Sequence, residues 1–328
     1  MNAVYYKAEI QHSGKHTEPT CSLGNKMITV QEPWLIYRNR LLQRLCRMHL
    51  ASGINSRIRL PFRNIWNKSL LAFSFDPEER LCVILNAHFY AMSETGFFAY
   101  IKKRFPQSRI VLDFSDKYEY FARTYKTFPS PEELLRLFDL VMTYNVHDVK
   151  KYGFTLKCPC FPKFKEYSDN FDIPESDLFF VGQNKGRLPL LIDLFEKCQN
   201  KGLRCDFHIV GVEESQMQYP KMIEYNRHMT YEEVICRVKH TKCVINLVQE
   251  NGEGVTMRDY EALKYNKYLL TNNYSLKETG LYTDQQIIWI DNFDDRIECI
   301  NTELPFMIDY ASVYGENRLM EWLENEVF

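Results

Sequence analysis

The segment Asp177–Gly211 constrains the fold more than any other part of this 328-residue chain. Its apolar run Leu178–Val181 has the length of a buried strand and leads into the glycine-containing turn Gly182–Arg187. Apolar residues then recur at helical spacing until Gly202, and Phe207–Gly211 reads as a second strand. This order predicts a βαβ unit, because parallel strands need a crossover helix between them.

The turn Gly182–Arg187 has the composition of a phosphate-binding loop. It carries Asn184, Lys185 and Arg187 and faces the N-terminus of the predicted helix. Free N–H groups and the helix dipole favour an anion at such a position. The alternative is an ordinary turn with solvated basic side chains, and the turn alone does not decide between the two.

The alternation of strand and helix continues along most of the chain. Before the opening segment we expect strands at 81–85, 109–112 and 140–144, helices at 94–104, 131–138 and 146–151, and loops at 86–93 and 113–116. After it we expect strands at 222–225, 243–248, 268–270 and 287–290, and helices beginning at Thr230, at 256–265 and at 312–324. The pattern predicts an α/β protein with two parallel-sheet domains of Rossmann type.

Length and charge also indicate two domains. Residues 1–165 hold 25 Lys/Arg against 14 Asp/Glu (+11), whereas the remainder holds 16 against 29 (−13), which sums to the net charge of −2. The proline-containing stretch 158–174 lies where the balance reverses, so we place the boundary of the first domain, 1–165, there. Ten dispersed cysteines without a CxxC pair, and eight dispersed histidines, favour neither a disulfide scaffold nor a metal site. No signal peptide or membrane span is recognised, so a cytoplasmic location is expected.

A basic segment runs from Pro33 to Phe75 without an acidic residue. Arg40, Arg44 and Arg47 fall on one predicted helix face, beside a face formed by Leu41, Leu45 and Met48. Such a surface suits an anionic membrane or the phosphate of a lipid-linked substrate. Nucleic acid is the other polyanion it could meet, and a solvated helix face is the alternative without a partner.

The stretch Gln249–Leu263 has the composition of a second anion site. Arg258 at the start of a helix can reach a diphosphate held by the N–H groups of residues 255–257. Glu261 lies three positions later on the same face and could accept hydrogen bonds from ribose hydroxyls. A routine Arg–Glu pair on an exposed helix is the alternative.

Several of these motifs together resemble bacterial GT-B glycosyltransferases, in particular those of capsule, exopolysaccharide and lipopolysaccharide synthesis. They are the FFVG…KGR opening, the strand ending Ile-Val-Gly, the run GVTMRDYEAL followed by KYLLTNN, and Phe138–Gly153. The resemblance covers about residues 78 to 310. It implies two Rossmann-like domains facing across a cleft, with residues 166–310 binding a nucleotide-diphospho-sugar and residues 1–165 binding a glycan or lipid-linked acceptor. It further implies that a helix in 311–328 returns to the first domain, and that no metal or other cofactor is required.

The resemblance also implies roles for individual residues. Arg258, with Lys185 or Arg187, would hold the diphosphate, Glu261 the ribose, and the segment Tyr225–Thr230 would border the base. The full donor-binding set is Gly182, Asn184, Lys185, Arg187, Tyr225, Asn226, Gln249, Glu253, Thr256, Met257, Arg258 and Glu261.

The stereochemistry of transfer stays open at this point. Glu253 and Glu261 match the E-x7-E spacing of many retaining GT-B enzymes, but Glu253 lacks the Gly-Phe-Gly context usual there. An inverting mechanism needs a base that deprotonates the acceptor hydroxyl. Ligands of open α/β sheets lie beyond the carboxyl ends of the strands, which makes Glu94, Asp116 and His88 the candidates, with Glu94 as the first choice.

The leading hypothesis is therefore a metal-independent glycosyltransferase of bacterial surface polysaccharide synthesis. It would be cytoplasmic and peripheral at the inner face of the plasma membrane, with no nucleic acid partner. One alternative is a nucleotide-sugar epimerase or phosphorylase on the same fold. Another is a non-catalytic protein that binds a membrane or another polyanion.

Overall fold

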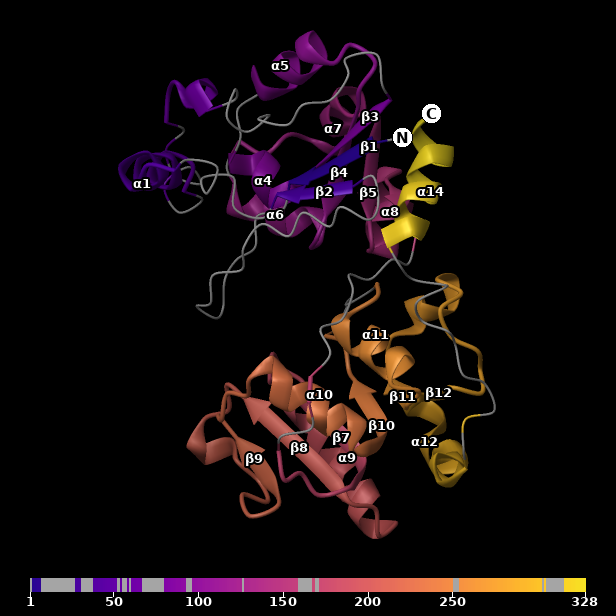
Figure 1. Cartoon of the computed structure of the whole chain (residues 1–328). Helices are drawn as coiled ribbons and strands as arrows, with labels where there is room; N and C mark the ends of the chain where they lie inside the picture. Colours follow the sequence, from indigo (N-terminus) through magenta and orange to yellow (C-terminus); the bar gives the residue numbers. More distant parts are fainter. Residues whose placement is uncertain are drawn as a thin grey trace. The chain divides into compact units, whose positions relative to one another are not determined.

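The computed structural model describes most of the chain. The described residues are 2–6, 27–30, 38–51, 54, 58, 60–66, 80–92, 96–125, 127–158, 167–168, 171–249, 254–302, 304 and 316–328. The chain divides into two compact units (Figure 1). Unit 1 comprises residues 1–160 and 316–328, and unit 2 comprises residues 161–315.

Within the described residues, unit 1 is built on a six-stranded parallel sheet of order β2-β1-β3-β4-β5-β6. The strands are β1 (Asn2–Tyr6), β2 (Met27–Val30), β3 (Leu81–Asn86), β4 (Arg109–Phe114), β5 (Leu140–Thr143) and β6 (Thr155–Leu156). The central strands β3 and β4 are buried almost throughout, as expected for a parallel sheet covered on both faces.

Helices of unit 1 cover one face of this sheet. They are α4 (Ala87–Met92), α5 (Gly96–Arg104), α6 (Tyr118–Thr124), α7 (Pro131–Leu137) and α8 (Val146–Tyr152), while α1 (Arg40–His49) and the short η2 (Arg63–Trp66) precede β3. Side chains of α4 to α7 pack with Leu81, Val83 and Leu112 into one aromatic-rich core cluster.

The helix α14 (Glu316–Val327) covers the other face of the same sheet (Figure 1). Its Leu319, Leu323 and Val327 are buried against side chains that alternate with those of the first cluster, such as Cys82 and Ile84 of β3. This alternation follows from the two-residue period of a strand.

Unit 2 contains a second six-stranded parallel sheet within its described residues, of order β12-β11-β10-β7-β8-β9. The strands are β7 (Ser176–Gln183), β8 (Cys205–Val210), β9 (Ile223–Tyr225), β10 (Thr241–Asn246), β11 (Tyr268–Thr271) and β12 (Ile287–Trp289). Renumbered from β7, this is the order 3-2-1-4-5-6 of dinucleotide-binding folds. The order reverses between β7 and β10, which are adjacent in the sheet.

Helices cover both faces of this second sheet. Residues of α9 (Leu188–Asn200) and α12 (Phe293–Arg296) pack on one face, while α10 (Tyr231–Lys239) and α11 (Met257–Lys264) pack on the other. Short 3₁₀ turns lie at η3 (Glu214–Gln216), η4 (Tyr274–Glu278), η5 (Ile290–Asn292) and η6 (Ile297–Asn301). The prediction of two Rossmann-type parallel-sheet domains is confirmed.

Some local predictions are wrong. The stretch expected to be a loop after 81–85 instead forms α4, and α6 occupies a stretch to which no element was assigned. Both are one or two turns long, too short to show a helical repeat of apolar residues. Asp113, expected in a loop, is part of strand β4, where its carboxylate lies 2.9 Å from Lys157 Nζ.

Candidate functional site

The point in unit 2 where the strand order reverses is the candidate site. In open α/β sheets ligands bind beyond the carboxyl ends of the strands at this position. The register pairs Phe179 of β7 with Val244 of β10, so three residues further on Gly182 lies beside Leu247. The turn after β7 and the loop after β10 therefore begin at the same edge of the sheet.

The turn after β7 is held tightly by backbone and amide hydrogen bonds. Lys185 and Gly186 adopt positive φ angles of 43° and 81°, which let the chain reverse toward α9. Asn184 N–H donates to Val210 O at 2.7 Å, and Asn184 Oδ1 accepts from Leu188 N at 2.9 Å. Asn184 thus caps the start of α9, while the exposed Lys185 forms no ion pair within the described part of the chain.

Arg187 joins the two loops. Its guanidinium donates to the backbone carbonyls of Gln183, Asn184 and Leu247, so it bridges the ends of β7 and β10. A Cβ added at Gly182 would stand 3.3 Å from Arg187 Nη2, so glycine gives the guanidinium its room. The predicted phosphate ligand is already engaged with carbonyl oxygens, and its first role is to hold the two loops together.

A buried polar cluster supports the loop after β10. Asn246 at the end of this strand donates to Thr256 Oγ1 at 3.0 Å and to Asp259 Oδ1 at 2.7 Å. Asp259 Oδ2 accepts from Thr256 N at 2.6 Å. Burial raises the pKa of Asp259 to about 6, although these hydrogen bonds oppose the rise. The sequence offered a signal for Asp259, because Thr256 and an acidic residue three positions later form a capping box.

Arg258 and Glu261 contact each other, as their spacing allows. Glu261 is fully buried, and its other oxygen accepts from Tyr231 Oη at 3.0 Å. Burial raises the pKa of Glu261, while the charge of Arg258 and these two hydrogen bonds oppose the rise. Arg258 keeps part of its side chain exposed, whereas both oxygens of Glu261 are occupied. Glu261 therefore orients Arg258 in the structure, and its contact with a ribose stays a prediction.

Residues after β11 complete this edge of the sheet. Asn272 exchanges two hydrogen bonds with the backbone of Val248, at 2.7 and 3.1 Å. Asn273 Nδ2 donates to Gly254 O at 2.7 Å, and Ser275 Oγ accepts from Gly254 N at 2.8 Å. The run Thr-Asn-Asn after an apolar strand is part of the resemblance, but the scaffold role of these residues depends on long-range contacts that sequence does not show.

The segment predicted to border the base is anchored at both ends. Asn226, at φ 57°, uses its amide oxygen to accept from the N–H groups of Gly211 and Val212 at 2.8 and 3.1 Å. Tyr225 Oη donates to Gln218 O at 2.7 Å. Thr230 caps α10 by accepting from Glu233 N at 3.2 Å, which confirms the predicted cap.

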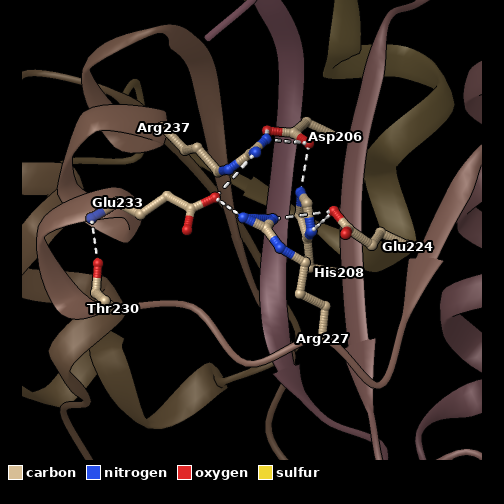
Figure 2. A network of polar contacts seen from close by, with 7 residues as sticks. All are labelled: Asp206, His208, Glu224, Arg227, Thr230, Glu233 and Arg237. Atoms are coloured by element: carbon tan, nitrogen blue, oxygen red, sulfur yellow. Dashed lines mark hydrogen bonds and ion pairs between the residues drawn. The ribbon is translucent and has the colours of Figure 1, made fainter. Parts of the chain in front are cut away.

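Thr230 with Glu233 three positions later predicts a capping box. That part of the prediction is wrong, because the side chain of Glu233 joins a charge network instead (Figure 2). It lies 2.5 Å from Arg227 and 3.2 Å from Arg237, and Arg237 in turn lies 2.7 Å from Asp206. The ring of His208 spans Asp206 and Glu224, with contacts of 2.6 and 2.9 Å. This network ties β8, β9 and α10 together and fixes the segment that ends at Thr230.

In unit 1 two of the three base candidates can be described. His88 is the second residue of α4, and its Nδ1 lies 3.2 Å from Tyr125 Oη. Burial among aromatic rings lowers the pKa of His88, and the charge of Asp116 opposes this. His88 is therefore held neutral near pH 7, as a base must be. Asp116 accepts from Lys117 N at 2.8 Å.

The remaining predicted site residues differ in position. Gln249 is exposed in the loop after β10, and Met257 is exposed at the start of α11. Glu94 and Glu253 lie outside the described residues.

Among the described residues no group of three or more His, Cys, Asp or Glu side chains could hold a metal ion. No helix there combines the length and apolar content needed to cross a bilayer.

A scan against protein-family models and a search of curated proteins find no match to this chain. Solved structures do match. AviGT4, a glycosyltransferase involved in avilamycin A biosynthesis, aligns with 100% of this chain and 97% of its own, at 11% identity and a TM-score of 0.54. The fold is GT-B.

Two further matches have lower scores. A sucrose-phosphate synthase from Thermosynechococcus elongatus aligns with 99% of this chain and 88% of its own, at 10% identity and a TM-score of 0.47. A UDP-forming trehalose-phosphate synthase from Burkholderia xenovorans aligns with 98% and 89%, at 10% identity and a TM-score of 0.44. Within the GT-B fold of the present chain, the loops joined by Arg187 belong to unit 2 and His88 belongs to unit 1.

Proposed function

We propose that the protein is a glycosyltransferase. It transfers a sugar from a nucleotide-diphospho-sugar, bound by unit 2, to a glycan or lipid-linked acceptor, bound by unit 1, in bacterial surface polysaccharide synthesis. The acceptor class and the biological setting are supported by the sequence motifs shared with that group of enzymes. The GT-B fold, seen also in the glycosyltransferase AviGT4, is consistent with the reaction.

One observation carries the donor site. The turn after β7 and the loop after β10 meet at the reversal of strand order, where Arg187 donates to Leu247 O. The edge that they form carries Lys185, Arg258 and the N-terminal ends of α9 and α11. Cationic side chains and helix N-termini stabilise a leaving diphosphate without requiring a metal ion. We therefore assign the diphosphate to Lys185 and Arg258, with Arg187 holding the loops that present them.

The catalytic base is assigned to unit 1. His88 is the candidate whose described environment suits the role, because it is neutral near pH 7 and Tyr125 orients its ring. In an inverting reaction it would accept the proton of the acceptor hydroxyl as the sugar–phosphate bond breaks. Asp116 would stabilise the imidazolium that forms.

The donor assignment is tested first by thermal unfolding with UDP-, GDP-, CMP- and dTDP-sugars. A ligand that binds only the folded state raises the midpoint, by about 2.7 kcal/mol of apparent stability at a hundredfold excess over its dissociation constant. We expect one nucleotide class to stabilise the protein. The absence of a shift with all four would contradict the assignment.

The stabilising donor is then incubated with and without a mixture of glycan and lipid-linked acceptors. Release of the nucleoside diphosphate that depends on acceptor supports transfer. Interconversion of the free nucleotide sugar would indicate an epimerase, and phosphate-dependent release would indicate a phosphorylase.

Arg258 needs a conservative substitution in this test. Removal of its charge leaves buried Glu261 unpaired, at a cost of about 3–5 kcal/mol to stability, so alanine would confuse folding with binding. Arg258→Lys keeps the charge but loses the planar fork that matches a diphosphate. We expect weaker donor binding with little change in the ligand-free midpoint. Glu261→Gln is the paired control, because it removes the charge that orients Arg258 while Arg258 itself is kept.

A further inference from the structure

The helix α1 turns its apolar stripe away from the core of unit 1. Cys46 is its buried residue, and Leu50 directly after it is also buried. At 3.6 residues per turn, Leu41, Leu45 and Met48 form a stripe on the side opposite these two. They are 64%, 46% and 53% exposed. An amphipathic helix of a globular protein normally buries its apolar stripe. An exposed stripe of this kind indicates binding to a membrane or to another protein.

A row of arginines runs along the edge of this stripe. Arg40, Arg44 and Arg47 are exposed, and none forms an ion pair with a residue in the described part of the chain. The sequence from Pro33 to Phe75 contains no acidic residue that could neutralise them. Asn39 fixes the start of the helix by accepting from Leu41 N at 2.8 Å.

The segment after α1 adds apolar side chains beside it. His49, the last residue of the helix, contacts Pro61 O through Nε2 at 2.8 Å and accepts from Trp66 Nε1 at 3.2 Å. These bonds fix a segment in which Phe62 is 73% and Ile65 59% exposed. Phe62 also adopts φ 57°, a conformation that a bulky residue rarely takes. Non-glycine residues in such conformations are concentrated at functional sites.

We propose that this face docks on an anionic lipid bilayer. The α1 face comprises Arg40, Arg44, Arg47, Leu41, Leu45 and Met48. The helix would lie in the plane of the bilayer, with the apolar stripe at the boundary of headgroups and acyl chains and the arginines at the lipid phosphates. A nucleic acid would satisfy the arginines but would leave the aliphatic stripe in water, so the lipid surface fits both halves of the face. This inference rests on α1 and the segment that follows it, and not on the proposed function.

Sedimentation of the full chain with phosphatidylcholine vesicles, with and without phosphatidylglycerol, tests the proposal. We expect binding to the anionic vesicles that weakens as salt is added. The variant Arg40→Gln/Arg44→Gln/Arg47→Gln should bind about fivefold more weakly per arginine, or on the order of 100-fold in total. The variant Leu41→Ser/Leu45→Ser/Met48→Ser keeps every charge and should still lose more than about tenfold.

Matched controls separate the face from general surface chemistry. Lys103→Gln/Arg123→Gln/Arg136→Gln removes three exposed positive charges elsewhere in unit 1. Leu135→Ser/Leu137→Ser removes two exposed leucines of α7. The affinity of both controls for anionic vesicles should stay within about twofold of the wild-type affinity, because charges away from the bilayer are screened by salt. Circular dichroism and the thermal midpoint check that each variant is folded.

Three outcomes would overturn the proposal. The first is no binding of the wild type to anionic vesicles. The second is an unchanged affinity in the leucine and methionine variant, which together with binding to duplex DNA or RNA would assign the arginines to nucleic acid. The third is self-association in the absence of lipid that the same variant abolishes, which would assign the face to a second copy of the chain. Donor-induced stabilisation should be equal in all variants, so its loss would concern the proposed function instead.

Discussion

The burial of His88 predicts how kcat/KM should depend on pH. Burial lowers its pKa below the ordinary value, so the neutral form persists to more acidic pH than for an exposed histidine. If it is the base, the acid limb of the kcat/KM profile should lie below about pH 6.5. His88→Gln should lower kcat by about 10²–10⁴-fold.

A second histidine of unit 1 provides the control. His147 is exposed at the start of α8, and His147→Gln should leave both the rate and the acid limb unchanged. An acid limb that persists in His88→Gln would assign the base elsewhere, with Asp116 and Glu94 next to be tested.

Asp148 makes the stability of unit 1 depend on pH. It is fully buried; its Oδ2 accepts from Tyr118 N at 2.9 Å, while Oδ1 has no hydrogen-bond partner among the described residues. Burial raises its pKa to about 6, above the value near 4 of an unfolded chain. The native state therefore binds the proton more tightly, and this contribution to stability is present below about pH 4 and is lost as pH rises through 6.

Urea unfolding of wild type and Asp148→Asn between pH 4 and 7.5 measures that contribution. Asparagine keeps an oxygen for Tyr118 N–H but cannot ionise, so the wild type should lose stability relative to the variant as pH rises. Asp172→Asn, at an exposed carboxylate, should give a curve parallel to that of the wild type. Parallel curves for Asp148→Asn as well would contradict the assignment.

At the scale of elements, α14 is the helix whose packing is most directly testable. Leu323 is fully buried in the cluster that it shares with Ile84 and Val111. Leu323→Ala should destabilise the protein by about 3 kcal/mol, through lost burial and the cavity left behind. Glu326→Ala, on the exposed side of α14, should change stability by less than about 0.5 kcal/mol. Denaturant midpoints of the two variants provide the comparison.

Elements that contain an uninterrupted run of apolar residues were predicted from the sequence, and short elements without such a run were missed. The strands 81–85, 109–112 and 268–270 were found because an uninterrupted apolar run has few alternative interpretations. The helix α4 was missed because Asn86 and His88 look like loop residues until Tyr125 and the aromatic core surround them. Element order alone could not reveal that Arg187 reaches the end of β10, since that contact joins residues 60 positions apart.

The same distinction applies to the candidate site. Arg258 and Glu261 could be paired from their spacing, because residues three positions apart on a helix lie on the same face. That Tyr231 of α10 takes the second oxygen of Glu261 depends on how α10 and α11 pack, which spacing does not encode. The roles of Asn272 and Ser275 likewise became visible only with the sheet in place.

For the whole molecule, the proposal assigns donor binding to one unit. Hydrogen exchange with and without the stabilising nucleotide sugar should show slower exchange of amides in 182–188 and 254–258. Amides of β3, β4 and β5 in unit 1 should exchange at unchanged rates when no acceptor is present. Protection confined to unit 1 would contradict the assignment of the donor to unit 2.

The position of α14 in the sequence has a consequence for biosynthesis. The sheet of unit 1 is covered on one face by a helix that the ribosome makes only after all of unit 2. During translation this apolar face stays uncovered by α14 while about 150 further residues are synthesised. The face comprises Cys82, Ile84, Val111 and Met142. A nascent chain halted before α14 should therefore be a preferred client of chaperones that recognise exposed apolar strands.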